Sequence, residues 1–350
     1  MGLMETGPGE SGPAITAAEA MSAERVLGLA AEAMRRYDFS PRATLEPFTV
    51  APGHVALRID DPVVDERAVL RLHHPGRHHV SELRSELLWL DALLAGRVME
   101  VPPPIAARSG ERVITLDDPD GDGDRHATVH GWLEGEAVPH AAARPSDFAR
   151  LGATAARLHA HTASWPRPAG FCRRSWSAAR LLAPLDDPGT DPAAGADPES
   201  AALLARAEAA VRADLAAFPC TPDAYGLIHA DLGLHNVLVG AGPAGEAVRV
   251  VDFDDCGPGW FAYDCASAFA GAEPVGDAPG LVAAWCEGYR SVRDLPPRNA
   301  AQIPAFLMLG RLTALGAAAS SPAPEAGPAR AAAADLACEL AERYLRGEVV

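Results

Sequence analysis

The stretch LIHADLGLHNVLVG, residues 227 to 240, constrains the fold most, because it places polar side chains on a short loop between two apolar runs. The flanking residues Leu227 and Ile228, and residues 237–239, have the composition of short buried strands. His229, Asp231 and Asn236 are therefore expected on a tight loop that is fixed at both ends. A loop of this kind can hold a catalytic group rigidly.

A second polar cluster follows in VVDFDD, residues 250 to 255, again directly after a β-branched run. Asn236 and Asp252 would supply the oxygen ligands that a hard cation such as Mg²⁺ prefers, beside substrate phosphates. Asp231 would then be free to orient a hydroxyl nucleophile. The order H-x-D-x-x-x-x-N followed by D-F-x has the logic of the catalytic and metal loops of kinases.

The hydrophobic pattern changes from strands to helices along the chain. Antiparallel strands are predicted in HVALRI and RAVLRL, and two further strands in ERVITL and RHATVHGWLEG. A helix is predicted from about Ser22 to Tyr37, and another in VSELRSELLWLDALL, where the apolar residues follow helical spacing. From about Pro145 onward the chain is expected to be mainly helical, with a loop at 183–200 and a strand pair around residue 250.

This pattern predicts an α+β protein with two main parts. Residues 1–20 are rich in Gly, Pro, Glu and Ala and are expected to form a disordered leader. Residues 21–134 are predicted to form a small lobe with a mostly antiparallel sheet and one key helix. Residues 135–350 are predicted to form a larger, mainly helical lobe that carries both polar clusters.

The composition excludes several classes of partner and mechanism. A net charge of −17 argues against nucleic acid or an anionic membrane and suits a cationic or metal-bound ligand. All 30 basic residues are arginine, so no mechanism can use a lysine amine. Six cysteines without C-x-x-C spacing indicate reduced thiols in the cytoplasm. The longest apolar run, 305–319, is interrupted by Arg311 and is too short to span a bilayer.

These motifs resemble the aminoglycoside phosphotransferase and choline kinase-like family, which has a protein-kinase-like fold. The resemblance extends from about residue 45 to 290 and is strongest in LIHADLGLHNVLVG and VVDFDDCGPGWFAYDCA. It implies that Asp231 is the catalytic aspartate, that Asn236 and Asp252 bind the metal, and that Asp264 is structural. VLRLHHPGRHHVSELRSELLWL and GWLEG further resemble homoserine-kinase-like enzymes and bacterial stress-response Ser/Thr kinases.

The same resemblance implies an ATP site in the small lobe. Arg71 occupies the position of the family's phosphate-binding Lys or Arg, and Glu86 that of the helix glutamate that holds this cation. Residues 130–133, with His130 and Trp132, would form the hinge whose backbone meets adenine. The expected phosphate loop, TVAPGHVALRI with Gly53 and His54, lacks G-x-G-x-x-G. An arginine can still bind two phosphate oxygens, in a geometry different from that of lysine.

Several of these residues have an alternative structural interpretation. Asp231 and Asn236 could cap turns, and Glu82 is as well placed as Glu86 to pair with Arg71. Asp254 is either a second metal ligand or a turn residue.

Three further groups of side chains favour structural roles. His229 is expected to order the loop rather than act as a base. Packing is the default role of the isolated tryptophans. The histidines at 73, 74, 78 and 79 lack carboxylate or thiolate neighbours, so they do not indicate a metal site.

The predicted function is ATP- and Mg-dependent transfer of the γ-phosphate to a hydroxyl of a small acceptor, most simply one that bears an amine. The alternatives are a compact bacterial Ser/Thr protein kinase and a nucleotide-binding pseudokinase with a regulatory role. A metallohydrolase built on HADLGLH would need more clustered histidines than the sequence offers. Only eleven residues separate Asp252 from Asp264, and no A-P-E element is present, which argues against an activation segment.

Overall fold

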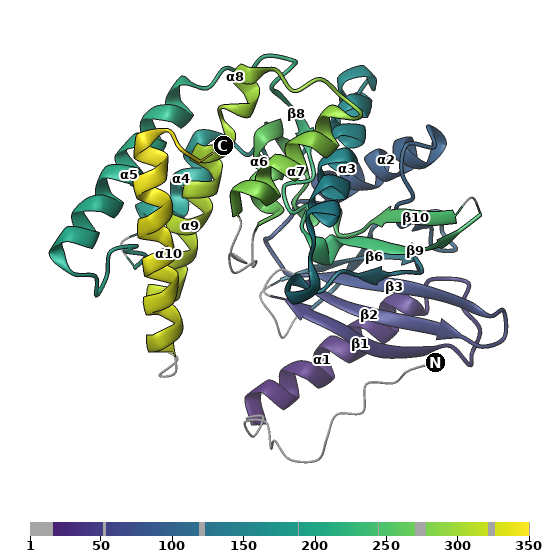
Figure 1. Ribbon diagram of the computed structural model, residues 1–350. Coiled ribbons are helices and arrows are strands. Elements are labelled where there is room, and N and C mark those ends of the chain that lie inside the picture. Colours follow the sequence, from purple (N-terminus) through teal and green to yellow (C-terminus); the bar gives the residue numbers. More distant parts are fainter. Residues whose placement is uncertain are drawn as a thin grey trace. The chain divides into compact units, whose positions relative to one another are not determined.

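A computed structural model of the chain describes residues 17–51, 54–118, 123–187, 189–243, 245–269, 278–320 and 326–349 (Figure 1). The chain divides into two compact units. The first comprises Met1–Val80 and Pro104–Trp132, and the second comprises Ser81–Pro103 and Leu133–Val350. The predicted division into a leader and two lobes stays a prediction.

The first unit is built on a six-stranded antiparallel sheet with the order β1-β2-β3-β6-β4, in which β5 also pairs with β6. Alternating apolar residues of the predicted strands, such as Leu57, Ile59, Leu70 and Leu72, are buried in its core. Helix α1 packs against β3 and β5. The elements are α1 (Ala17–Met34), β1 (Thr44–Ala51), β2 (His54–Asp61), β3 (Glu66–His73), β4 (Pro104–Ile105), β5 (Ile114–Leu116) and β6 (Arg125–Gly131).

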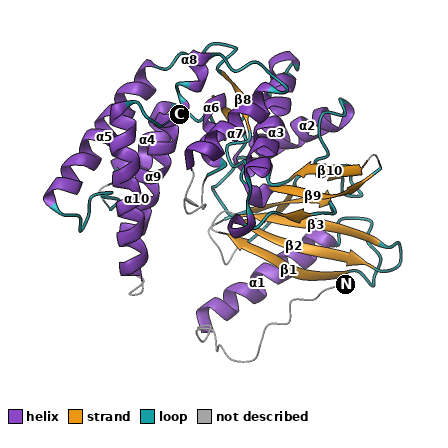
Figure 2. Cartoon of the chain, viewed as in Figure 1, coloured by secondary structure: helices purple, strands orange, loops and turns teal. Residues whose placement is uncertain are grey.

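The second unit is mainly helical, as Figure 2 shows. Helices α3 and α7 pack so closely that a Cβ atom at Gly152 would lie 1.9 Å from the Trp285 carbonyl oxygen, and one at Gly288 would lie 1.9 Å from that of Ala149. Helix α9 packs against α4, α5, α6 and α10. The helices are α2 (Val80–Ala95), α3 (Pro145–Ser164), α4 (Ala178–Asp186), α5 (Pro198–Ala217), α6 (Phe261–Ser267), α7 (Ala278–Arg290), α8 (Pro297–Ala300), α9 (Ile303–Ser320) and α10 (Ala326–Arg346).

Two small sheets in this unit hold the polar clusters. One has the order β10-β9-β7, and the other pairs β8 with β11. The two strands predicted around the first polar loop are thus present, but each pairs with a different partner. Three short 3₁₀ helices follow or lie between them. The elements are β7 (Glu136–Ala137), η1 (His140–Ala142), β8 (Tyr225–Ile228), η2 (Leu234–Asn236), β9 (Val237–Gly242), β10 (Gly245–Val250), η3 (Phe253–Asp255) and β11 (Gly257–Trp260).

Some predicted boundaries were wrong. The first helix begins at Ala17 rather than Ser22 and ends at Met34, while residues 1–16 of the predicted leader lie outside the described residues. The loop predicted at 183–200 is shorter, because α4 continues to Asp186 and α5 begins at Pro198 after an Asp197 N-cap.

One segment of the described residues, Pro297–Ala318, is long and apolar enough to cross a membrane by length and composition. It is 56% buried inside the protein, and buried core helices commonly have such a composition. Each of the six cysteines is a free thiol.

Candidate active site

The loop after β8 holds Asp231 through a strained backbone. Ala230, directly before it, has a left-handed conformation with φ 70°, which costs a non-glycine residue energy. The carboxylate of Asp264, at the start of α6, accepts hydrogen bonds from the N–H groups of His229 (3.1 Å) and Ala230 (2.7 Å). This buried anion therefore fixes the turn that presents Asp231.

A chain of buried hydrogen bonds lies behind Asp264. The Arg293 guanidinium donates to the Tyr289 hydroxyl (2.6 Å), and that hydroxyl lies 3.1 Å from His159 Nδ1. His159 Nε2 lies 2.9 Å from Asp264 Oδ2. With Arg293 as the donor, Tyr289 donates to Nδ1, and His159 donates from Nε2 as a neutral imidazole. Complete burial lowers the pKa of His159, which agrees with this arrangement.

His229 has both ring nitrogens engaged with the backbone. Its Nε2 lies 3.0 Å from the Val251 carbonyl oxygen, and its Nδ1 accepts the N–H of Asp231 at 3.3 Å. The ring is completely buried. These contacts agree with the predicted role of His229 in ordering the loop, and they link the catalytic loop to the strand that leads into the second cluster.

Asn236 joins the two polar clusters. Its side-chain nitrogen donates to the backbone oxygen and to Oδ2 of Asp231, both at 2.9 Å. Its backbone carbonyl accepts the N–H of Val251 at 3.0 Å, which places Asp252 next in the chain. Asp252 has a left-handed backbone, with φ 62° and ψ 63°, where β10 passes into η3. The structure thus brings the three predicted residues of this unit to neighbouring turns.

The donor set suits a hard divalent cation. Because the amide nitrogen of Asn236 donates to Asp231, its oxygen is the group left for a cation, and Asp252 adds a carboxylate. Within the described part of the chain, no group of three or more His, Cys, Asp and Glu side chains could hold a metal ion. A site of one amide and one carboxylate would therefore depend on nucleotide phosphates and water for its remaining ligands.

His235 is a neighbour of Asp231 that the motif pattern did not predict. Its Nε2 lies 3.3 Å from Asp231 Oδ2, and hydrogen bonding to this carboxylate raises the pKa of His235. The ring of His140 lies 6.5 Å away, and its pKa is lowered by burial and by His235. The one sequence feature that could have indicated this contact is the position of His235 directly before Asn236 in the motif.

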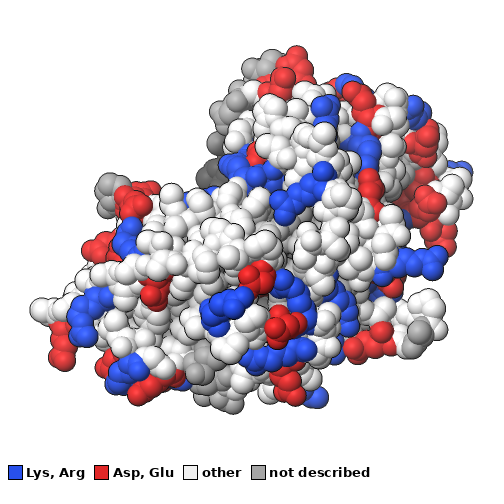
Figure 3. All heavy atoms as spheres, turned by 90° about the horizontal axis from the view of Figure 1, so that it is seen from above, with Lys and Arg blue, Asp and Glu red and all other residues white. Residues whose placement is uncertain are grey.

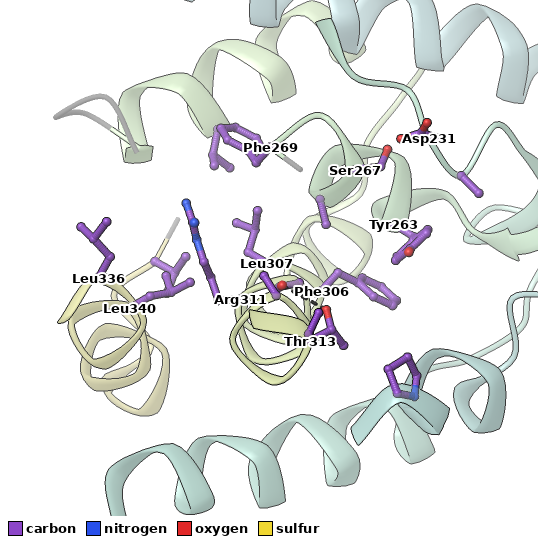
Figure 4. A pocket seen from close by; sticks show the side chains of 18 of the residues that line it. Asp231, Tyr263, Ser267, Phe269, Phe306, Leu307, Arg311, Thr313, Leu336 and Leu340 are labelled. Carbon is purple, nitrogen blue, oxygen red and sulfur yellow. Dashed lines mark hydrogen bonds between the residues drawn. The ribbon is translucent and has the colours of Figure 1, made fainter. Parts of the chain in front are cut away.

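A cavity of about 690 Å³ lies beside the catalytic loop (Figure 4). Asp231, Asp255, Tyr263 and Ser267 line its polar part. The remaining wall comes from Phe269, α9 and α10 and is mostly apolar, but three charged side chains, Arg311, Glu339 and Arg343, also line it. All of these residues belong to the second unit, so one compact body provides both the Asp231 carboxylate and the cavity beside it.

The predicted nucleotide residues are distributed over both units. Arg71 lies on β3 opposite Thr128 and is 7% exposed, and Glu86 lies buried on α2 in the second unit. Their pairing stays a prediction. Gly53 and the side chain of His54 lie outside the described residues.

Of the predicted hinge residues 130–133, His130 lies near the end of β6 and Trp132 follows this strand, both in the first unit, whereas Leu133 begins the next part of the second unit. His130 is buried, and its Nε2 lies 3.1 Å from the Thr128 hydroxyl. The backbone N–H of Trp132 donates to the Arg67 carbonyl at 3.1 Å, and the Arg67 guanidinium lies over its ring. An adenine would thus have to use other backbone groups of residues 130–133.

Comparisons with known proteins agree on the family. Residues 55–295 match the model of the phosphotransferase enzyme family, APH. A homoserine kinase from Gluconobacter oxydans is 30% identical over 228 residues, which cover 63% of this chain and 66% of that enzyme.

Solved structures agree on the fold. The structure of a microcompartment-associated aminopropanol kinase is 34% identical and covers 93% of this chain and 99% of its own, with a TM-score of 0.81. An amicoumacin kinase in complex with AMP-PNP and Ca²⁺ has the same fold at 19% identity and a TM-score of 0.70, over 93% of this chain and 96% of its own. The predicted α+β protein-kinase-like fold is thus confirmed. The chain belongs to the phosphotransferase enzyme family, and it is a kinase that acts on a hydroxyl group.

Proposed function

We propose that this enzyme transfers the γ-phosphate of Mg-ATP to a hydroxyl of a small acceptor that bears an amine. The observation that carries the proposal is that Asp231 lies at the wall of the 690 Å³ cavity, beside a second carboxylate, Asp255. One carboxylate can accept the hydroxyl proton, while the other attracts a positive charge. The names of the relatives are compatible with this class, since homoserine and aminopropanol are small hydroxylated amines.

In this mechanism Asp231 orients the acceptor hydroxyl toward the γ-phosphorus and accepts its proton. Asn236 and Asp252 would hold Mg²⁺, which neutralises charge on the phosphates. The hydrogen bond from Asn236 to Oδ2 of Asp231 fixes the orientation of the Asp231 carboxylate. Arg71 and Glu86 are proposed to serve the phosphates, and residues His130 to Leu133 the adenine. The site is proposed to work in the cytoplasm, where the six thiols stay reduced.

Attraction of a cation is expected from Asp231 and Asp255, although the lining of the cavity also includes Arg311 and Arg343. The chain has a net charge of −17, yet acidic and basic side chains are interspersed on the face seen in Figure 3. Tyr263 contributes an aromatic ring beside Asp255, and burial raises the pKa of its hydroxyl, which therefore stays neutral. An aromatic face and a carboxylate together suit an ammonium group.

A compact Ser/Thr protein kinase is the second candidate. The short segment between Asp252 and Asp264 is compatible with it, but the predominantly apolar cavity beside Asp231 favours a small molecule.

A panel of acceptors with labelled ATP tests the choice. It contains amino alcohols, homoserine, aminoglycosides, a protein mixture and, as a matched neutral acceptor, a propanediol beside aminopropanol. We expect an amine to be the fastest acceptor and its kcat/KM to fall as salt rises, since screening shortens the field to about 8 Å. Asp255→Asn should raise KM for the amine but not for the diol. A protein or the diol phosphorylated faster than every amine would contradict the proposal.

A further inference from the structure

Arg173, between α3 and α4, is a buried guanidinium that the catalytic motifs do not include. Its side chain is 2% exposed, so its donors must be satisfied inside the protein. Nε donates to the Cys256 carbonyl at 2.6 Å, and Nη1 donates to the Glu82 carbonyl on α2 at 3.1 Å. Nη2 donates to the carbonyls of Phe253 (3.4 Å) and Asp254. One side chain thus holds backbone groups of two separate elements.

The charge of this guanidinium is balanced on α2. Nη1 lies 3.6 Å from Oε2 of Glu86, and the Glu86 side chain is only 3% exposed. A buried ion pair of this kind is costly to break, because removal of one partner leaves an isolated charge in a medium of low dielectric. Glu86 therefore connects α2, through Arg173, to residues 253–256.

The clamped segment begins directly after Asp252. That residue has the left-handed backbone, and η3 follows it immediately. The N–H of Cys256 donates to the Phe253 carbonyl at 3.0 Å, which closes the turn. Carbonyls at the end of a helical turn carry partial negative charge, and Arg173 neutralises three of them. The guanidinium thereby stabilises a turn that would otherwise depend on a strained residue.

We propose that Arg173 is a positioning residue, which ties the turn after Asp252 to α2 and so preorganises the metal-binding carboxylate for Mg-ATP. The inference rests on the proposed function. Arginine suits the role because its planar fork directs donors at several carbonyls at once, whereas a lysine ammonium has three donors on one atom. Residues that orient metal ligands without touching the metal typically change metal affinity by about 10- to 100-fold.

The neighbouring arginine provides a matched control. Arg174 donates to the Glu82 carboxylate at 3.0 Å, but its side chain is 48% exposed. Both Arg173→Lys and Arg174→Lys retain the positive charge. Any difference between the two variants therefore reports the burial of Arg173 and the geometry of its hydrogen bonds. Calorimetry would measure ATP binding with Mg²⁺ and with EDTA, and circular dichroism would confirm folding.

Arg173→Lys should weaken Mg-dependent ATP binding by about 10-fold or more and leave ATP binding in EDTA unchanged. Arg174→Lys should change neither value by more than about 2-fold. A folded Arg173→Lys protein with normal Mg-dependent binding, or with an equal loss in EDTA, would overturn the role of Arg173. Failure of the wild-type protein to bind Mg-ATP would instead contradict the proposed function.

Hydrogen exchange on the wild-type protein decides the question if Arg173→Lys does not fold. The Cys256 amide should exchange slowly in EDTA, because the turn is already formed without metal. Rapid exchange in EDTA that becomes slow only with Mg-ATP would show that the metal, and not Arg173, orders this segment.

Discussion

The loop that carries the proposed catalytic aspartate (residues 229–236) and the loop that follows the proposed metal ligand Asp252 (residues 253–256) are each held by a buried side chain, of opposite charge in the two loops. Each contains a left-handed residue that is not glycine, Ala230 in the first and Asp252 in the second. In the catalytic loop a buried carboxylate, Asp264, accepts hydrogen bonds from two backbone N–H groups. In the metal loop a buried guanidinium, Arg173, donates to three backbone carbonyls.

This difference follows from which backbone groups each turn exposes inward. Around Ala230 the backbone N–H groups point to the interior, and the Asp264 carboxylate accepts their hydrogen bonds. Around residues 253–256 the backbone carbonyls point to the interior, and the Arg173 guanidinium donates hydrogen bonds to them. Asp264 and Arg173, which anchor the two loops, are both distant in the sequence from the backbone groups that they bind. Asp231 and Asp252, to which we assign the catalytic and metal-binding roles, can therefore be disturbed separately, either by replacing these side chains or by replacing Asp264 or Arg173.

The largest expected effect is at the metal loop itself. Asp252→Ala should abolish Mg-dependent ATP binding and activity, because Asn236 alone is a neutral ligand. Asp255→Asn, three residues along, should retain Mg-dependent binding, since Asp255 lines the acceptor cavity. Calorimetry with Mg-ATP measures both variants, and unchanged binding in Asp252→Ala would remove this residue from the metal site.

A smaller effect is expected at the anchor of the catalytic loop. Asp264→Asn would turn an amide NH₂ toward N–H donors and lose charge-assisted hydrogen bonds, at a cost of about 3 kcal/mol in the free energy of unfolding. Asp187→Asn is the control, because Asp187 is exposed and its Oδ1 contact with the Gly189 N–H can be kept. Urea unfolding of both variants checks this, and equal stability would show that Asp264 does not fix the loop.

The smallest expected effect is a pH dependence of stability through His159. Its pKa is lowered in the folded protein, so the unfolded chain binds the proton more readily. The neutral ring contributes its full stability above the ordinary histidine pKa of about 6.5, and this contribution is lost as the pH falls below that value.

Between pH 6.5 and 5.5 the free energy of unfolding should fall by up to about 1 kcal/mol more in the wild-type protein than in His159→Gln. Comparison of the two proteins cancels the other histidines. The same pH dependence in both would show that burial does not hold His159 neutral in the folded protein.

The sequence was informative where function depends on local spacing. The positions of Asp231, Asn236 and Asp252 within one motif predicted a shared site, and the structure places the residues on adjoining turns. Periodicity likewise predicted the antiparallel strands 54–59 and 67–72, because alternation of apolar residues fixes which face is buried.

The resemblance predicted that Asp264 is structural, but the partners of Asp264 and the role of Arg173 could not be predicted from local spacing. His159, Tyr289 and Arg293 meet Asp264 only because α3 packs against α7 through close backbone contacts at two glycines. Arg173 had no local signal, since its carbonyl partners lie 91 residues earlier in the chain, at Glu82, and about 80 residues later, in residues 253–256. Such contacts depend on tertiary packing, which hydrophobic periodicity does not specify. Partner choice for β8 and β9 was missed for the same reason.

The proposal that Asp231 acts in phosphate transfer, and not in Mg-ATP binding, is tested most directly with Asp231→Asn. Single-turnover transfer from labelled Mg-ATP to the best amine acceptor, measured with calorimetric Mg-ATP binding on the same preparation, separates chemistry from binding. We predict that transfer slows by about 100-fold or more while Mg-ATP affinity changes little, because Asp231 acts on the hydroxyl during transfer. Transfer at the wild-type rate, or an equal loss of Mg-ATP binding, would contradict the assignment of Asp231 as the catalytic aspartate.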